Sequence, residues 1–253
     1  EEKFVQDALT GAITELARSI EIVTESLRNG GRLFYVGAGS SGRIGVLDAS
    51  EIPPTFGASP DLVQGVIAGG VTALYRSVEG AEDEESAGAL AMRERGIKNK
   101  DVIIGITASG RTPFVLGALA WAKSFGAKTI LLTCNPAVAG GAEPSGARSS
   151  RPVGTTNADL TIALAVGPEV LTGSTRLKAG TATKAALNII STGAMVALGK
   201  VRGNLMIDLH TSSAKLRDRA VRIVAALTQS DYDSARRLLE EADWNLRAVA
   251  EKL

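Results

Sequence analysis

The chain is poor in the residues that build disulfides, metal centres and nucleic-acid surfaces. Its 253 residues include one cysteine, Cys134, and one histidine, His210. A single cysteine excludes an internal disulfide and a cysteine-based zinc site, and a lone histidine cannot build a metal site. The 28 basic and 27 acidic residues nearly balance, so no excess of positive charge favours nucleic acid. We therefore expect neither a metal nor a nucleic-acid partner.

Long apolar runs and aromatic residues are also scarce. No run reaches the roughly 20 apolar residues of a membrane-spanning helix, and no signal-like segment is evident, so we expect a cytoplasmic protein without a membrane partner. Aromatic residues make up 4% of the chain and hydrophobic residues 45%, so Ala, Val, Ile and Leu must build the core. This profile favours an α/β fold, a doubly wound and mostly parallel sheet flanked by helices.

Two short stretches rich in glycine and hydroxyl residues stand out against this background. The first Gly/Ser loop (residues 37–43) reads Gly-Ala-Gly-Ser-Ser-Gly-Arg, and the second (residues 108–112) reads Ala-Ser-Gly-Arg-Thr. Each follows an apolar, β-branched run and precedes a predicted helix. Hydroxyls and free N–H groups at the start of a helix, together with the helix dipole, suit a phosphate. Two such loops on neighbouring strands predict a small phosphorylated ligand held from two sides.

The first loop also has the form of the Gly-x-Gly-x-x-Gly fingerprint of dinucleotide sites, with Gly37, Gly39 and Gly42. That fingerprint requires an acidic residue at the end of a second strand, about 20 residues on. Asp61 has roughly this spacing, but it follows Pro60 in a Pro/Gly-rich stretch. The serine pair and the second loop favour a compact sugar phosphate instead. A nucleoside triphosphate site of the P-loop type is not expected because its motif is absent.

The remaining pattern predicts alternating helices and strands. Pro53 and Pro54 are expected to keep residues 50–56 out of helix. Residues 135–157, rich in Gly, Ala, Pro and Ser, are expected to form a long mobile loop. Apolar spacing predicts strands at 33–36, 63–67, 101–107, 129–133 and 160–164, and helices at 4–28, 41–49, 112–125 and 182–198.

After His210 the pattern changes to short charged helices, over residues 214–227, 232–241 and 244–253. We therefore expect two domains, an α/β domain over residues 1–210 and a small helical subdomain over residues 211–253. Packing or support of a dimer is the expected role of the subdomain.

Six motifs follow one another in an order typical of a known family. They are the two Gly/Ser loops, Asp-Ala-Ser-Glu-Ile-Pro-Pro-Thr (48–55), Val-Glu-Gly-Ala-Glu-Asp (78–83), Leu-Thr-Gly-Ser-Thr-Arg-Leu-Lys-Ala-Gly-Thr (171–181) and Gly-Asn-Leu-Met-Ile-Asp (203–208). Over almost its whole length the chain resembles the bacterial N-acetylmuramic acid 6-phosphate etherases, which have the sugar isomerase (SIS) fold. Glucokinase regulatory protein carries related motifs. Residues 139–156 form a longer Gly/Ala/Ser stretch than the family usually has.

The resemblance implies a reaction of cell-wall amino sugar catabolism and recycling. The lactyl ether at carbon 3 of N-acetylmuramic acid 6-phosphate is eliminated and water is added, which yields N-acetylglucosamine 6-phosphate and D-lactate. Opening the sugar ring gives an aldehyde that acidifies the proton on carbon 2. Acid–base groups then suffice, so no cofactor is expected.

The resemblance also implies which residues act. Glu51 would serve as the acid and base at the ether oxygen and the incoming water, and Glu82 would take the proton from carbon 2. Considered alone, Glu51 also fits a solvated turn and Glu82 a helix cap. The implied phosphate-binding residues are Ser40, Ser41, Ser109, Gly110, Arg111 and Thr112, for which ordinary helix capping is compatible with ligand binding. The implied contacts to the sugar or the lactyl group are Ser174, Thr175 and Lys178.

Two other functions remain as alternatives. An aldose–ketose isomerase of the same fold would also move a carbon-2 proton, but such sites commonly pair a glutamate with a histidine, and His210 is the only histidine. A non-catalytic sugar-phosphate sensor need not keep both glutamates, whereas this chain has both. Because sites in this fold usually lie near a dimer interface, we expect a homodimer with a small-molecule sugar phosphate as ligand.

Overall fold

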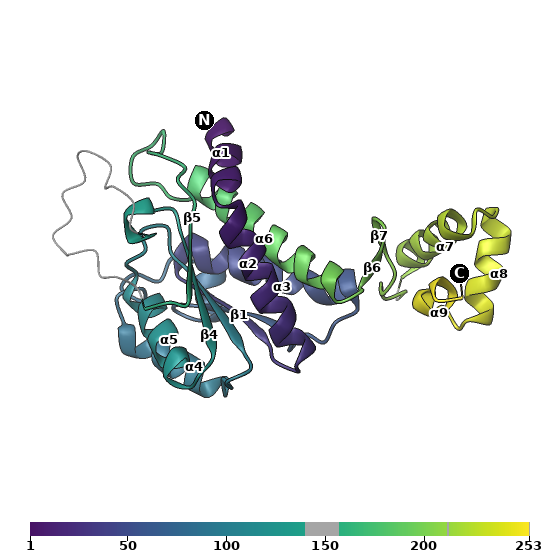
Figure 1. Cartoon of the computed structure of the whole chain (residues 1–253), viewed down its shortest axis with the longest axis horizontal. Helices are drawn as coiled ribbons and strands as arrows, with labels where there is room; N and C mark the ends of the chain where they lie inside the picture. The colour runs from purple at the N-terminus through teal and green to yellow at the C-terminus, as the bar shows by residue number, and fades with distance from the viewer. Residues whose placement is uncertain (140–156, 212, 253) are drawn as a thin grey trace. The chain divides into compact units, whose positions relative to one another are not determined.

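The chain forms two compact units (Figure 1), and the computed structural model describes residues 1–139, 157–211 and 213–252. One unit comprises Glu1–Ser50 and Asp61–Ala194, and the other comprises Glu51–Pro60 and Met195–Leu253. The predicted domain boundary at residue 210 stays a prediction. Most of the predicted loop at 135–157 lies outside the described residues. Among the described residues, no helix is long and apolar enough to cross a membrane.

A five-stranded parallel sheet forms the centre of the first unit. Its strands are β1 (Leu33–Gly37), β2 (Val63–Ile67), β3 (Val102–Ile106), β4 (Lys128–Thr133) and β5 (Leu160–Ala163), and their order is β2-β1-β3-β4-β5. The strand order reverses between β1 and β3, where Gly37 is in register with Ile106. Ligands of open α/β sheets bind at such a switch point, beyond the carboxyl ends of the strands. The two Gly/Ser loops follow these two strands and therefore lie side by side, as predicted.

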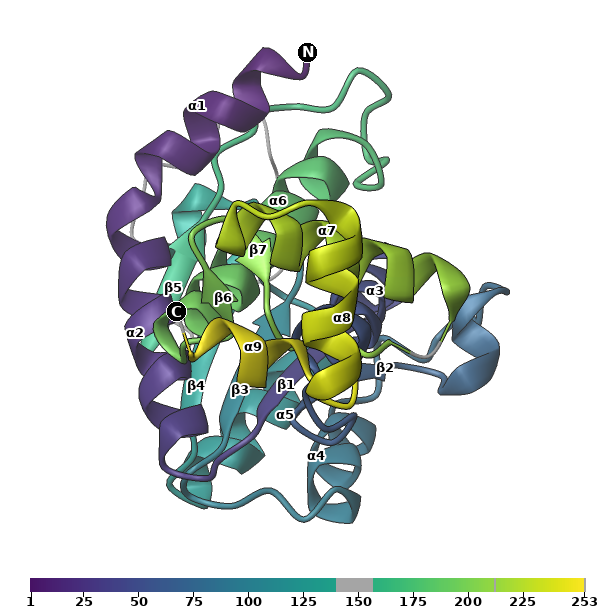
Figure 2. The ribbon, with the colours of Figure 1, turned by 90° about the vertical axis from the view of Figure 1, so that its right-hand side faces the viewer.

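Helices cover both faces of the sheet, which confirms the predicted α/β class. The helices are α1 (Lys3–Gly11), α2 (Ile13–Arg28), α3 (Gly39–Phe56), α4 (Glu85–Glu94), α5 (Pro113–Ser124) and α6 (Lys178–Ala197), with short 3₁₀ helices at Val71–Leu74 and Pro136–Ala139. Figure 1 shows α4 and α5 on one face and α2, α3 and α6 on the other. Figure 2 shows α2 alongside β5, which it contacts.

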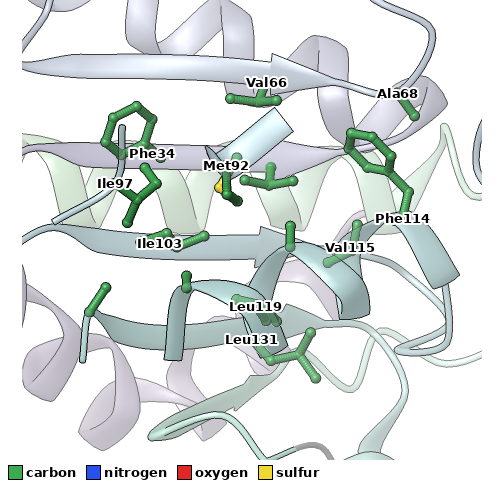
Figure 3. Close-up of a cluster of buried hydrophobic side chains, with 14 of the residues drawn as sticks. Phe34, Val66, Ala68, Met92, Ile97, Ile103, Phe114, Val115, Leu119 and Leu131 are labelled. Carbon is green, nitrogen blue, oxygen red and sulfur yellow. The ribbon is translucent and has the colours of Figure 1, made fainter. Parts of the chain in front are cut away.

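The face beneath α4 and α5 is a closely packed apolar core (Figure 3). Phe34, Ile103 and Leu131 of three neighbouring strands are fully buried there against α5. Gly88 of α4 lies so close to the Phe114 carbonyl of α5 that a side chain would not fit. The two helices therefore pack backbone to backbone, which fixes the segment that leads into α4.

The opposite face holds a buried polar network. The Tyr35 hydroxyl of β1 donates to Asp48 Oδ2 of α3 at 2.8 Å. Asp48 Oδ1 accepts from Asn188 Nδ2 at 2.7 Å and from Ser191 Oγ at 3.2 Å, both on α6. Because buried polar groups require partners, this network fixes α3 against β1 and α6.

Two local predictions were wrong. The predicted helix over 4–28 is divided into α1 and α2 at Ala12, whose φ of −104° and ψ of 16° are not helical. Gly11 precedes the break and is a weak helix former. Residues 50–56 were expected outside helix, yet α3 continues through Pro53 and Pro54 to Phe56. Ile52 and Phe56 are buried there, and such packing overrides local propensity.

The second unit has a core of its own. Residues 195–252 contribute the hairpin of β6 (Val201–Arg202) and β7 (Leu205–Met206), followed by α7 (Ala214–Thr228), α8 (Tyr232–Glu241) and α9 (Leu246–Ala250). The side chains of Ser213, Asp231 and Asn245 cap these three helices at their N-termini. The helices enclose a separate cluster of buried apolar side chains, among them Val224, Leu239 and Leu246.

Candidate functional site

The first Gly/Ser loop is a tight turn from β1 into α3. A Cβ atom on Gly37 would lie 2.6 Å from the backbone nitrogen of Gly42, and one on Gly42 would lie 2.8 Å from the Gly37 carbonyl oxygen. Both glycines are thus required for the end of the strand to approach the start of the helix. Ser40 and Ser41 lie in the first turn of α3, half-buried, where the helix dipole attracts an anion.

The second Gly/Ser loop is held by its own hydroxyl groups. The hydroxyls of Thr107 and Thr112 are 2.8 Å apart, and Ser109 Oγ accepts from the Arg111 N–H at 3.2 Å. Gly110 has a φ of +74°, and a Cβ atom there would lie 2.5 Å from Val138. Thr112 is the N-cap residue of α5, but its side chain makes no capping hydrogen bond. The loop is thus shaped before any ligand binds.

Glu82 is held next to this loop by its main chain. The Phe114 N–H, in the first turn of α5, donates to the Glu82 carbonyl at 3.0 Å. Helix α4 begins only at Glu85 with Glu84 as its N-cap, so Glu82 does not cap that helix. Its side chain is exposed. The alternative of a capping role for Glu82 is therefore not observed.

A cavity of about 320 Å³ joins Glu82 to the start of α3. Gly39 and Arg43 line it from the first Gly/Ser loop, and Glu79 and Glu82 line it from the segment before α4. Glu79 was not among the predicted site residues, although it lies in the same sequence motif as Glu82. Arg43 donates to main-chain carbonyls of residues 74 and 76. The structure thus brings one predicted catalytic residue together with the first predicted phosphate loop.

The start of α6 is already occupied by a carboxylate of the chain itself. Glu169 accepts from the backbone N–H groups of Lys178 and Ala179 at 3.0 and 2.9 Å. Lys178 Nζ lies 2.5 Å from the Glu1 carboxylate and 4.9 Å from the centre of the Phe4 ring. Ser174 and Thr175 lie in the preceding loop. Within the described part of the chain, none of residues 174–178 lines the Glu82 cavity, and their roles stay predictions.

Glu51 belongs to the second unit and is exposed. It lies within α3, two residues before Pro53, so its residue is helical and not part of a solvated turn. Its role stays a prediction.

Cys134 and His210 do not line the Glu82 cavity. Burial raises the pKa of the Cys134 thiol to about 12, so it is not a nucleophile at neutral pH. His210 is exposed in the second unit. Over the residues that the structure describes, no group of three or more His, Cys, Asp or Glu side chains could hold a metal ion.

Comparison with known proteins identifies the family of this chain. Residues 15–123 match the model of the glucokinase regulatory protein N-terminal SIS domain. The chain is 53% identical over 254 residues to the N-acetylmuramic acid 6-phosphate etherase of Gloeobacter violaceus, a match that covers 98% of this chain and 77% of the relative. It is 51% identical over 247 residues to that of Symbiobacterium thermophilum, with the same coverage. This chain belongs to the N-acetylmuramic acid 6-phosphate etherase family.

Solved structures of sugar-phosphate isomerases share the fold of this chain. A putative phosphosugar isomerase involved in capsule formation from Bacteroides fragilis matches with a TM-score of 0.54 and 18% identity over 78% of this chain and 87% of the other. The phosphoheptose isomerase of Neisseria gonorrhoeae matches with a TM-score of 0.50 and 17% identity over 79% and 92% of the two chains. At this identity the likeness establishes the fold alone.

Proposed function

We propose that the chain cleaves the lactyl ether of N-acetylmuramic acid 6-phosphate and releases D-lactate and N-acetylglucosamine 6-phosphate. Relatives that are 53% and 51% identical to this chain are named for this activity. The observation that supports it best within the site is the cavity that Glu82 shares with the start of α3, because a phosphate bound at that helix would bring a sugar next to a carboxylate.

The elimination of lactate requires two proton transfers, and the addition of water requires two more. In the open-chain aldehyde, Glu82 takes the proton from carbon 2, the bond between carbon 3 and the ether oxygen breaks, and Glu51 gives its proton to the departing lactate oxygen. Glu51, now a carboxylate, takes a proton from the water that adds to carbon 3, and Glu82 returns its proton to carbon 2. Both glutamates end in their starting states, and no electrons are exchanged with a cofactor.

Binding of the substrate would use both Gly/Ser loops. The phosphate would accept hydrogen bonds from hydroxyl and N–H groups. Ser174 and Thr175, from the loop before α6, and the Lys178 side chain would contact the sugar or lactyl group. The residues of the loops that we assign to the phosphate are Ser40, Ser41, Ser109, Gly110, Arg111 and Thr112.

We further infer that the enzyme is a homodimer and acts in the cytoplasm, in amino sugar catabolism and peptidoglycan recycling. Leu47 of α3 and Ile189 of α6 are 51% and 40% exposed, and they adjoin the hydrogen-bonded pair Asp48 and Asn188. Exposed apolar side chains on these two hydrogen-bonded helices support a second copy as their cover. Sedimentation equilibrium tests this, since a Leu47→Lys, Ile189→Lys variant is expected to sediment as a monomer while the wild type sediments as a dimer.

The assay that tests the function is release of D-lactate from N-acetylmuramic acid 6-phosphate, with EDTA present and the unphosphorylated sugar as control. Release from the phosphorylated sugar alone is the expected result. Tight binding of the sugar phosphate without release would instead favour a non-catalytic regulator. Conversion of an aldose phosphate to its ketose would favour an isomerase.

A further inference from the structure

Arg43 lines the cavity, and its side chain binds main-chain carbonyls of the protein itself. Its place in a Gly/Ser loop suits a phosphate ligand, but its Nε donates to the Leu74 carbonyl and its Nη2 to the Arg76 carbonyl, both at 3.1 Å. Leu74 ends the 3₁₀ helix Val71–Leu74. The last carbonyls of a helix lack partners within it, and a cationic donor satisfies them well.

The segment that Arg43 binds leads directly to Glu82. Residues 75–80 are all exposed, and Gly80 adopts a φ of +74°. Val78 packs against Gly69, and few other side-chain contacts restrain this stretch. It is held at its far end by the hydrogen bond from the Phe114 N–H to the Glu82 carbonyl. At its near end it is held by a main-chain hydrogen bond to the Thr72 carbonyl and by the two side-chain hydrogen bonds from Arg43.

These contacts span the two walls of one cavity. Arg43 belongs to α3, which starts in the first Gly/Ser loop, and Glu82 belongs to the segment opposite. The guanidinium group thus links the helix that would hold the phosphate to the segment that carries the carboxylate. Its planar fork reaches two carbonyls at once, which the single ammonium of a lysine does not reproduce.

We propose that Arg43 is a positioning residue that sets the distance between Glu82 and the phosphate end of the substrate. The proposal rests on the proposed role of Glu82 as the base at carbon 2. A displacement of about 1 Å at a reacting group lowers a rate by about a hundredfold. Loss of Arg43 should therefore slow removal of the carbon-2 proton without weakening the binding of the sugar phosphate.

The test compares three variants with the wild type. Arg43→Ala removes both hydrogen bonds, and Arg43→Lys keeps the positive charge without the planar fork. Arg76→Ala removes an exposed arginine side chain but keeps the main-chain carbonyl that Arg43 binds. Three quantities are measured for each: exchange of the carbon-2 proton for deuterium at saturating substrate, KM, and Kd for N-acetylglucosamine 6-phosphate. Thermal unfolding of each variant shows that it is folded.

We expect exchange to fall about a hundredfold in Arg43→Ala and about tenfold in Arg43→Lys, with KM and Kd within threefold of the wild type. Arg76→Ala should match the wild type in all three quantities. A tenfold or greater rise in KM and Kd with unchanged exchange would show that Arg43 is a phosphate ligand, and would overturn the proposal. Exchange within twofold of the wild type in Arg43→Ala would overturn it as well. If the wild type itself neither exchanges the proton nor releases lactate, the proposed function fails, which is a distinct result.

Discussion

Arg247 of α9 binds Asp208 through both arms of its guanidinium group. Nε lies 2.5 Å from Asp208 Oδ1 and Nη2 lies 2.6 Å from Oδ2, while Lys200 Nζ lies 2.9 Å from Oδ2. Asp208 also lies directly against Gly57, where a side chain would not fit. The Asp208 carboxylate therefore joins α9 to the start of the hairpin, while the main chain at Asp208 packs against the end of α3, all within the second unit.

This arrangement predicts how the stability of the second unit depends on pH. Partial burial alone would raise the pKa of Asp208, but hydrogen bonds and positive charge from Arg247 and Lys200 lower it below its usual value. A carboxyl group with a lowered pKa stabilises the fold above its unfolded pKa of about 3.9, and that stabilisation is lost as the pH falls through the folded pKa. We expect Asp208→Asn to lower the free energy of unfolding by about 1–2 kcal/mol at pH 7 and to match the wild type near about pH 2.

Urea unfolding followed by Trp244 fluorescence measures this, in a background where Trp121 is replaced by Phe so that only the second unit reports. Arg222→Ala is the control, because it removes an exposed ion pair with Asp218 on α7 that is expected to contribute under about 1 kcal/mol. A difference between Asp208→Asn and the wild type that is the same at both pH values would contradict the prediction.

Substitution of Glu82 and substitution of Glu51 are expected to block different steps of the reaction. Glu82→Gln should abolish exchange of the carbon-2 proton and, with it, lactate release, because glutamine cannot accept the proton. Glu51→Gln should retain exchange while lactate release falls by at least about a hundredfold, because the leaving group is no longer protonated. Mass spectrometry of the recovered substrate in D₂O and a D-lactate assay measure the two steps separately. If Glu82→Gln exchanges normally, the assignment of the base is wrong.

Gly37→Ala should damage the first Gly/Ser loop. The new methyl group would lie 2.6 Å from the Gly42 nitrogen, so the loop must open, at a cost of about 1–3 kcal/mol in the free energy of unfolding. The Kd for N-acetylglucosamine 6-phosphate should rise at least about tenfold, since a displaced loop loses N–H contacts worth at least about 1.4 kcal/mol. Gly11→Ala is the matched control, because the added methyl group meets no atom beyond its own helix backbone within 4 Å and alanine favours helix. Equal effects of the two substitutions on Kd would argue against the loop as the phosphate site.

Cys134 should be inert in the folded protein. Its pKa of about 12, raised by burial, leaves almost no thiolate at pH 8. A thiol reagent is expected to label it only after denaturation, and Cys134→Ala should keep lactate release within about twofold because the thiol has no part in the proton transfers. Rapid labelling of the folded enzyme, with loss of activity, would refute this.

The sequence pattern allowed the sheet and its two Gly/Ser loops to be predicted because both arise from short stretches of chain. An apolar run that ends in Gly and Ser specifies a strand, a turn and a helix start locally, and the order β2-β1-β3 then places the two loops together. The path of α3 through Pro53 and Pro54 was not predictable in this way, because it depends on the burial of Ile52 and Phe56.

The same limit applies to the contacts around Glu82. The acceptors of Arg43 lie 31 and 33 residues away, and the Phe114 N–H that binds the Glu82 carbonyl lies on another helix. No local pattern identifies such partners. Motif order alone pointed to Glu82, and only the fold shows which neighbours hold it in the cavity.

The hydrogen bond between Phe114 and Glu82 uses only main-chain atoms, so every amino acid at position 82 would preserve it. At position 82 the fold therefore depends on the main chain, whereas the proposed reaction depends on the side chain. If Glu82 is the base that we propose, a single substitution there would abolish catalysis and leave the sugar-binding loops intact. In a fold that also serves regulatory proteins, this independence makes the evolutionary step from enzyme to sensor a short one.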